Sequence, residues 1–428
     1  MAGYIWNKYR NAYSGLPLEV WYLSIALFIN RSGAMVLAFM TLYLTEEIEI
    51  TEATAGGLLS LYGLGAISGN YVGGRLTNRV GSVRLQILML VCAAPMFLLI
   101  PLCNTILEIG IGIFFMSFFA ESVRAPNSTA IAQFTPKEKQ ARAYALQRMA
   151  VNLGFSFGPF VGGYLAEIDY FWIFVVDAIT TLGAAGILAY FFGLQKYSKT
   201  LTDDVKQELA NNIATKTRSP LADRKFLMFL GLLLATAIVF FQFHAMYPLY
   251  LRDHFGLGKP GIGKLYAINT VLIVLFEMVL IDHIKNWKIM RLIGWGCFLS
   301  CIGFGMMPFS TAVGYCVLSM VVVTVGEMLA FPLCSGWLGQ RSERGDQAMY
   351  MGWYTMTFSL AGVLSPMLGG MVYQFNPHLF WYASLGVGFL VLGGFYLLEK
   401  AIDQEESVQT EELTGSARQT RSVDPGPA

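Results

Sequence analysis

Charged side chains interrupt several long apolar stretches of this 428-residue sequence, and their types suggest proton and anion chemistry. Glu121 and Arg124 are three residues apart, so on a helix they share a face and can pair. Arg31 is a second cation that could compete for the same carboxylate. Charges are costly in an apolar interior and usually serve a function there. We expect a ligand or a proton to redistribute this pairing; the alternative is a permanent salt bridge that only holds the structure.

Glu327 is the clearest candidate to carry a proton. It lies in an apolar stretch, and the residue three positions further on is Ala330, so no cation is adjacent in sequence. An unpaired carboxyl in such surroundings can exchange its proton near neutral pH. The alternative is a buried, protonated Glu that satisfies a backbone carbonyl. His244 competes for the same task because a free imidazole titrates near physiological pH, although it could equally join two helices by a hydrogen bond.

Polar residues near these charges complete a candidate binding site. Its predicted members are Asn30, Arg31, Glu121, Arg124, Gln242, His244, Tyr247, Asn269 and Glu327, with Glu327, Glu121 and His244 as proton-coupling candidates. The abundant Phe, Tyr, Trp and Met should line the rest of the site and suit an amphipathic ligand. Asp177 and Glu277 rank lower, and we expect them to act as gate or interface residues.

The elements that must position these residues are membrane helices. Hydrophobic residues make up 55% of the chain and charged residues only 13%, against about 25% charged in ordinary globular domains. Apolar runs near the ~20 residues that a bilayer requires recur from Leu18 to Leu398. The composition predicts an all-α polytopic membrane protein. Its twelve predicted spans are 18–44, 55–76, 83–103, 106–128, 143–167, 171–194, 226–251, 261–282, 289–309, 312–336, 348–373 and 378–399.

The distribution of basic residues predicts the orientation. Most Lys and Arg fall at the termini and in every second loop, whereas the alternate loops hold Arg252, Lys259 and Lys264. The first of these alternate loops, "TEEIEITEAT", has four acids and no base. Because basic loops stay inside, both termini should be cytoplasmic in a cell (inner) membrane. We see no cleavable signal peptide. The six cysteines form no CxxC pair, so we expect their thiols to pack in the interior and to bind neither a metal nor a cofactor.

The chain contains a repeat. "AESVRAP" (120–126) matches "GEMLAFP" (326–332), and "GPFVGG" (158–163) matches "SPMLGG" (365–370), at an offset of 206 or 207 residues. We therefore predict an N-terminal six-helix bundle (1–194), a cytoplasmic linker (195–225) and a C-terminal six-helix bundle (226–400). The polar tail (401–428) is predicted to be disordered.

Duplicated six-helix halves resemble the major facilitator superfamily, in which two bundles rock about a central site. "GRLTNRVGSVR" (74–84) is similar to the family's cytoplasmic signature Gly-x-Leu-x-Asp-Arg-x-Gly-x-x-Arg, and "GFSFGPFVGG" (154–163) to the motif of its drug:proton antiporters. The resemblance implies that spans one, four, seven and ten line the cavity and that both motifs act in conformational gating. The gating candidates are therefore Gly74, Asn78, Arg79, Gly81, Arg84, Gly154, Gly158, Pro159 and Gly162.

Glycines 154, 158 and 162 recur every four residues and form a smooth stripe, while Pro159 invites a kink. Small residues let membrane helices approach closely, so we expect this helix to act as a moving joint between bundles; plain helix packing is the alternative. The family pattern has Asp where this sequence has Asn78, which puts a charge-switched latch in doubt. Proton-coupled peptide transporters carry Glu-x-x-Glu-Arg in span one, and of that pattern only Arg31 remains beside Leu27 and Asn30.

These features predict a proton-coupled secondary transporter that works by alternating access. The antiporter-like motif favours export of a small amphipathic or organic compound, as in multidrug efflux. The alternative is proton-coupled uptake of an anionic or peptide-like solute bound by Arg31 and Arg124. An enzyme is not expected, because no phosphate-binding loop or nucleophile elbow appears. The predicted partners are a small-molecule substrate, protons and the lipid bilayer, with no nucleic acid, and we expect a monomer.

Overall fold

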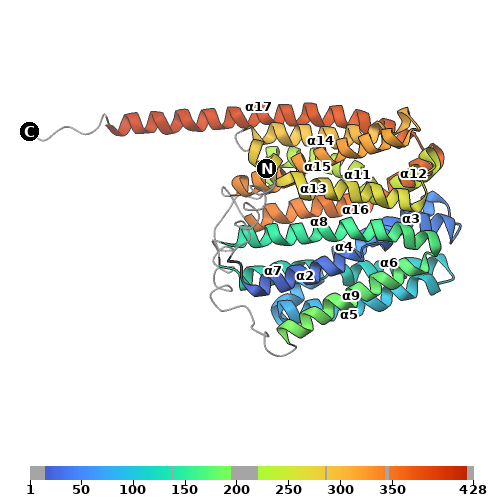
Figure 1. Cartoon of the computed structure of the whole chain (residues 1–428). Helices are drawn as coiled ribbons and strands as arrows, with labels where there is room; N and C mark the ends of the chain where they lie inside the picture. Colours follow the sequence, from blue (N-terminus) through green and yellow to red (C-terminus); the bar gives the residue numbers. More distant parts are fainter. Residues whose placement is uncertain (1–14, 137–138, 194–219, 285–286, 343–346, 422–428) are drawn as a thin grey trace, which may run out of the picture.

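The computed structural model describes residues 15–136, 139–193, 220–284, 287–342 and 347–421, and every structural statement below refers to these residues. Their regular secondary structure is entirely helical, which confirms the predicted all-α class. Most of the long helices run along one direction of the molecule (Figure 1). In lipid, a helix satisfies its own backbone hydrogen bonds, which is why long apolar sequences take this form.

The N-terminal part of the chain forms eight α-helices and one 3-10 turn. In order they are α2 (Leu18–Ser32), α3 (Val36–Glu46), α4 (Glu52–Val80), α5 (Ser82–Leu99), η1 (Ile100–Leu102), α6 (Ile106–Glu121), α7 (Arg124–Phe134), α8 (Gln140–Ile168) and α9 (Phe171–Phe192). The pairs α2/α3 and α6/α7 are each one membrane-length segment with a break in its middle. These breaks fall beside Arg31 and between Glu121 and Arg124.

The C-terminal part repeats this pattern with one break. Its elements are η3 (Pro220–Ala222), α11 (Arg224–Phe240), η4 (Phe241–His244), α12 (Tyr247–Phe255), α13 (Lys259–Ile284), α14 (Ile289–Gly305), η5 (Met307–Phe309), α15 (Val313–Ser342), α16 (Gln347–Phe375) and α17 (Leu379–Arg421). The break between α11 and α12 contains His244. α15, which carries Glu327, passes its own Pro332 without interruption.

Twelve membrane-length segments result. Ten described segments are long and apolar enough to cross a membrane. The other two are α4 and α8, each 29 residues long and richer in glycine and polar residues. These two helices lie on the seams with the opposite half of the molecule, α4 against α16 and α8 against α13.

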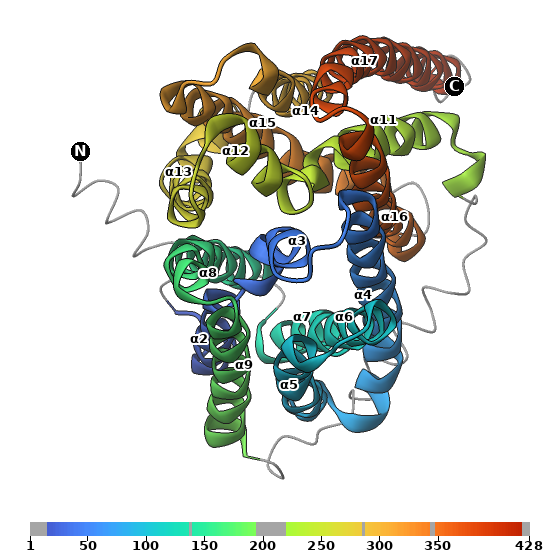
Figure 2. The ribbon, with the colours of Figure 1, turned by 90° about the vertical axis from the view of Figure 1, so that its right-hand side faces the viewer.

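The helices form two groups that meet along two seams (Figure 2). α2–α9 make one group and α11–α17 the other; α8 packs on α13 along one seam, and α4 on α16 along the other. Glycines bring backbones together at the α4–α16 seam: Gly63 lies against Gly362, and Ser60 Oγ donates a hydrogen bond to the carbonyl of Val363 at 2.8 Å. Close approach of small residues is how membrane helices associate.

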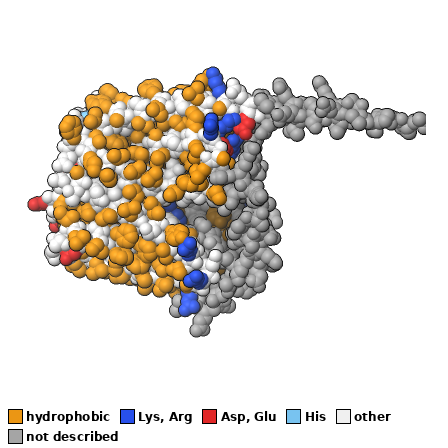
Figure 3. All heavy atoms as spheres, turned by 180° about the vertical axis from the view of Figure 1, so that it is seen from behind, with side chains coloured by type: hydrophobic (Ala, Val, Ile, Leu, Met, Phe, Trp, Pro, Cys, Tyr) orange, Lys and Arg blue, Asp and Glu red, His pale blue; other side chains and the backbone are white. Residues whose placement is uncertain are grey.

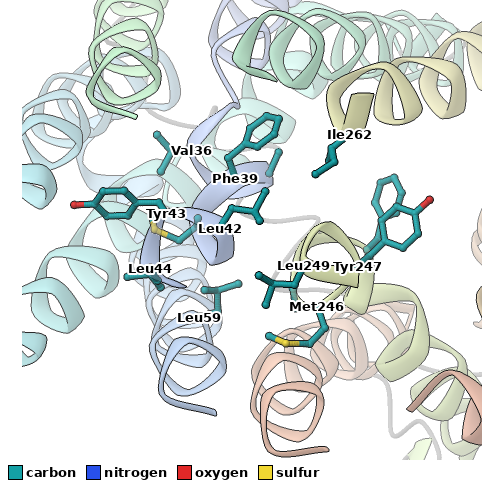
Figure 4. Close-up of a cluster of buried hydrophobic side chains, with 14 of the residues drawn as sticks. Val36, Phe39, Leu42, Tyr43, Leu44, Leu59, Met246, Tyr247, Leu249 and Ile262 are labelled. Carbon is teal, nitrogen blue, oxygen red and sulfur yellow. The ribbon is translucent and has the colours of Figure 1, made fainter. Parts of the chain in front are cut away.

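The hydrophobic cluster that the two groups share lies toward one end. We call the end near Glu46, Arg252 and Lys259 the far end, and the end near Leu18 and Arg224 the termini end. One hydrophobic cluster joins both groups toward the far end: Phe39 and Leu42 of α3 lie near Leu249 of α12 in Figure 4. Toward the termini end each group has a separate cluster, and Figure 3 shows a recess between the halves on that side. The molecule is therefore closed at the far end.

The structure describes part of the predicted tail as helix, since α17 runs from Leu379 to Arg421. Residues 401–421 are rich in Glu and Gln, which are good helix formers. They also extend a helix that has already formed, so they bear no nucleation cost. The predicted linker lies outside the described residues as far as position 219, and Arg224 already belongs to α11.

Candidate functional site

Three helices converge on the carboxylate of Glu121. Its Oε2 accepts from Arg124 Nη2 at 2.7 Å, and its Oε1 lies 3.5 Å from Arg31 Nη1. The Tyr62 hydroxyl, from α4, donates to Oε1 at 3.5 Å. The side chain of Glu121 is only 5% exposed, whereas that of Arg124 is 62% exposed. Two guanidinium groups face one carboxylate, so the cluster carries one excess positive charge.

The structure thus brings together three predicted residues and adds Tyr62, which the sequence analysis missed. A tyrosine hydroxyl carries no charge, and in sequence Tyr62 is one aromatic residue among many. Phe155 of α8 is a further addition, because the Arg31 guanidinium lies 5.7 Å from its ring centroid, within cation–π range.

Asp177 explains how the break in the first span is stabilised. Its two carboxylate oxygens accept hydrogen bonds from the backbone N–H groups of Met35 and Val36, each at 3.1 Å. These N–H groups begin α3 and have no partner within the helix. One turn further along α9, Thr181 Oγ1 accepts from Asn30 Nδ2 at 3.2 Å. Asp177 therefore caps α3 within its own group in this structure.

The glycine stripe of α8 faces this same break. A Cβ at Gly154 would collide with Arg31, and one at Gly162 with Met35. The opposite face of α8 meets the second group, since Ser156 Oγ and Thr270 Oγ1 are 2.7 Å apart and Gly163 contacts the carbonyl of Lys259. The stripe thus joins α8 to α2 and α3, while other residues of α8 form the seam between the groups. Pro159 lies on that seam, with its carbonyl against Gly263.

Glu327 occupies the position that the repeat assigns opposite Glu121, but its surroundings differ. Its Oε2 accepts from Asn269 Nδ2 at 3.0 Å, and the same amide nitrogen donates to Thr324 Oγ1 at 3.0 Å. Among the described residues no ion pair to Glu327 is found at salt-bridge distance. Where Glu121 has two arginines, Glu327 has one neutral amide, so its carboxyl can gain or lose a proton without breaking a salt bridge.

The three candidates of the seventh span are placed differently. Gln242 Nε2 donates to the carbonyl of Ser365 on α16, and its Oε1 has no partner among the described residues. The His244 ring packs on Phe243 and Tyr266. Tyr247 lies in an aromatic cluster with its hydroxyl buried and unpartnered in the described structure. Asn269 of α13 contacts Glu327 and Thr324.

The signature segment forms the turn between α4 and α5. Gly81 has a φ of 94° there, a conformation that side-chain-bearing residues rarely adopt. Asn78, Arg79 and Arg84 are exposed, and the described structure records no hydrogen bond or ion pair for them. Gly74 only approaches Ala125. With the far end closed, no charged contact holds this segment among the residues that the structure describes.

Ion pairs between the two groups are the main feature that the sequence analysis missed. At the far end Glu46 pairs with Arg252 at 2.9 Å and with Lys259 at 3.2 Å. On the α8–α13 seam Arg148 Nη2 lies 2.6 Å from Glu277 Oε1. The sequence shows these charges but not their partners, because each pair joins residues more than a hundred positions apart.

Comparisons with known proteins agree with this architecture. The antiporter "Na(+), Li(+), K(+)/H(+) antiporter" of Planococcus maritimus is 24% identical over 405 residues, which cover 87% of this chain and 91% of the relative. The quinolone resistance protein NorA of Staphylococcus aureus is 20% identical, with coverages of 86% and 92%. The uncharacterized transporter YttB of Bacillus subtilis is 23% identical, with coverages of 83% and 89%.

Solved structures share the fold. A peptide transporter POT in complex with sulfate superposes with a TM-score of 0.70 at 14% identity, covering 91% of this chain and 96% of its own. A POT family transporter in complex with 5-aminolevulinic acid gives 0.71 at 16%, with coverages of 90% and 96%. The family model described as Major Facilitator Superfamily matches residues 23–345 and 316–425. This chain therefore belongs to the major facilitator superfamily and is a multi-pass membrane transporter, not an enzyme.

Proposed function

We propose that this transporter exchanges protons for a small amphipathic or organic compound and exports that compound from the cell. The observation that carries the proposal is the environment of Glu327, a carboxyl midway along α15 that is held by Asn269 and by no cation within salt-bridge distance in the described structure. Such a group can load a proton from one side and release it to the other. The antiporter and quinolone-resistance names of two relatives support exchange and export.

In this proposal the two groups of helices are the bundles of an alternating-access cycle, with boundaries near residues 1–194 and 226–400. The closed far end would face outward and the termini would be cytoplasmic, in line with the basic loops at the termini end. Opening outward then requires the Glu46 ion pairs to break and the shared hydrophobic cluster to separate. Both seams lie within one chain, so we propose a monomer as the working unit.

A second candidate is proton-coupled uptake of an anionic solute. It is favoured by the excess positive charge at Arg31, Glu121 and Arg124 and by the exposure of Arg124. Two POT structures are peptide-transporter relatives in fold, but this chain has no carboxylate at Leu27 or Asn30, where their pattern has Glu.

The test is proton flux in liposomes that contain the purified protein and a trapped pH dye, with a panel of cationic, neutral and anionic compounds. We expect an added compound to release protons from acid-loaded vesicles, and Glu327→Gln to abolish this release because the amide cannot ionise. Full proton-driven transport by Glu327→Gln would refute the coupling role of Glu327. Proton movement in the same direction as the compound would instead establish symport.

A further inference from the structure

We propose that the Arg148–Glu277 ion pair transmits the protonation state of Glu327 from the C-terminal bundle to the N-terminal bundle, with Arg148 as the positioning residue on the N-terminal side. This inference rests on the proposed function, in which Glu327 carries the proton. It gives a specific role to Glu277, which the sequence analysis expected to be a gate or interface residue, and to Arg148, which is new to the site.

The placement of this pair distinguishes it from the other ion pairs. Of the pairs that the described residues form, those joining the bundles are Glu46–Arg252, Glu46–Lys259 and Arg148–Glu277. The first two close the far end. Arg148 and Glu277 lie nearer the termini end, on α8 and α13, where each bundle has its own hydrophobic cluster. The Arg148–Glu277 ion pair thus joins the bundles at a level where their hydrophobic clusters are separate.

Helix α13 links this pair to Glu327 directly. Asn269 of α13 donates to the Glu327 carboxyl at 3.0 Å, and the next residue, Thr270, hydrogen-bonds to Ser156 of α8. Glu277 follows Asn269 by eight residues, about 12 Å or two turns along the same helix. One rigid element therefore carries the contact to the proton site, a contact to the other bundle and the carboxylate of the ion pair.

The charges around Glu327 give the link its physical basis. Glu277 lies about two turns from Asn269, the hydrogen-bond partner of Glu327, and Arg148 pairs with Glu277 at 2.6 Å. Helix α14 presents Gly296 and Ser300 beside the neighbouring Gly326, and α16 presents the neutral phenol of Tyr354 to Ser335 of α15. With Glu327 protonated, Arg148 faces the single negative charge of Glu277. When Glu327 releases its proton, the C-terminal bundle presents two negative charges to Arg148.

The attraction between the bundles near the termini end therefore changes with each proton. A second carboxylate strengthens the pull on the Arg148 guanidinium, and protonation weakens it again. The exposures fit this role: Glu277 is 12% exposed and so is poorly screened, whereas Arg148 is 45% exposed and has room to move between carboxylates. The charge on Glu327 thus changes the attraction on Arg148 of the N-terminal bundle, although the two residues form no direct salt bridge.

The test measures the protonation of Glu327 without a substrate. Difference infrared spectroscopy of the purified protein during a pH titration follows the carboxylic acid C=O band, and the part of this band that Glu327→Gln removes belongs to Glu327. Removing the Glu277 charge with Glu277→Gln should shift the midpoint of that band to lower pH by about half a unit or more, because a nearby negative charge favours the protonated form. Arg148→Gln should shift it to higher pH by a similar amount.

Opposite shifts distinguish this inference from a structural role, because either substitution breaks the same ion pair. If the pair only held the bundles together, the two variants would behave alike, and that result would overturn the inference. Arg148→Lys keeps the charge and should keep the midpoint. Arg224→Gln removes an exposed charge elsewhere and is the matched control. Should Arg148→Gln fail to fold, the comparison of Glu277→Gln with Arg148→Lys still decides the sign of the effect.

The distance between the bundles tests whether the ion pair also changes their relative position. Spin labels on Tyr190→Cys and Leu397→Cys, exposed positions of α9 and α17, report that distance at the termini end after the native cysteines are replaced. We expect it to change with pH in the parent protein and to lose that dependence in Arg148→Gln. No Glu327 band in the infrared titration would refute the proposed proton site, whereas a band whose midpoint ignores Arg148 and Glu277 would refute only the present inference.

Discussion

Replacing Glu46 with Gln should shift the protein toward the form in which the far end is open. Glu46 accepts from Arg252 at 2.9 Å and lies 3.2 Å from Lys259, both in the C-terminal bundle, and accepts from Tyr170 at 2.7 Å within its own bundle. Opening the far end separates the first two contacts but leaves the Tyr170 hydrogen bond intact. Of the contacts that Glu46 makes, only the two ion pairs therefore bias the equilibrium between closed and open forms.

The magnitude follows from the exposure of these groups. The Glu46 side chain is 26% exposed, and those of Arg252 and Lys259 are 32% and 21% exposed. Pairs of this kind contribute between the ~0.2–1 kcal/mol of exposed pairs and the ~1.5–3 kcal/mol of well-ordered charged hydrogen bonds. Taking about 1 kcal/mol for each, the substitution should shift the equilibrium toward the open far end by about 2 kcal/mol, or roughly 30-fold.

Distances between spin labels on Ile168→Cys and Phe375→Cys, exposed positions near the far end of each bundle, measure this population. The matched control is Glu47→Gln, because Glu47 is exposed and has no hydrogen bond or ion pair in the described structure. High salt should act on the parent protein in the same direction as Glu46→Gln, since it screens partly exposed pairs. A distance distribution of Glu46→Gln identical to that of Glu47→Gln would mean that apolar packing alone closes this end.

Two further predictions concern stability. Gly154→Leu should destabilise the protein and disturb the Arg31–Glu121 contact, because a Cβ there would lie 2.6 Å from Arg31 Cβ. The control for thermal unfolding is Gly186→Leu, because Gly186 faces open space. Equal melting temperatures of the two variants would contradict the close approach at Gly154. Burial raises the pKa of Asp223, but hydrogen bonds from Arg341 and from the N–H of Phe226 outweigh it and hold the pKa below its ordinary 3.8. The lowered pKa means that Asp223 stabilises the fold above pH ~4 and loses that effect as the pH falls further. The melting temperature of the parent protein should therefore fall more steeply below pH ~4 than that of Asp223→Asn. Parallel curves of melting temperature against pH would exclude this contribution.

The sequence by itself determined the class of fold. Apolar runs of bilayer length, too few charges for a soluble domain and a repeat at an offset of 206 or 207 residues together predict membrane helices in two related halves. These signals are local or periodic, so they survive without any knowledge of contacts. The short spacing from Glu121 to Arg124 likewise predicts a pair on one helix, and the structure has it at 2.7 Å.

Only the tertiary structure decided which charges are paired. Glu121 and Glu327 occupy equivalent repeat positions, yet one meets two arginines and the other an amide of α13. The ion pairs Glu46–Arg252 and Arg148–Glu277 join residues far apart in sequence, and no local pattern specifies them. Asp177 became a helix cap because α9 passes a break in the first span. Composition also does not reveal that the last helix, α17, continues as far as Arg421. The sequence specifies the chemistry of each side chain. The packing of the helices determines which partner each charged side chain meets, and that partner determines its role.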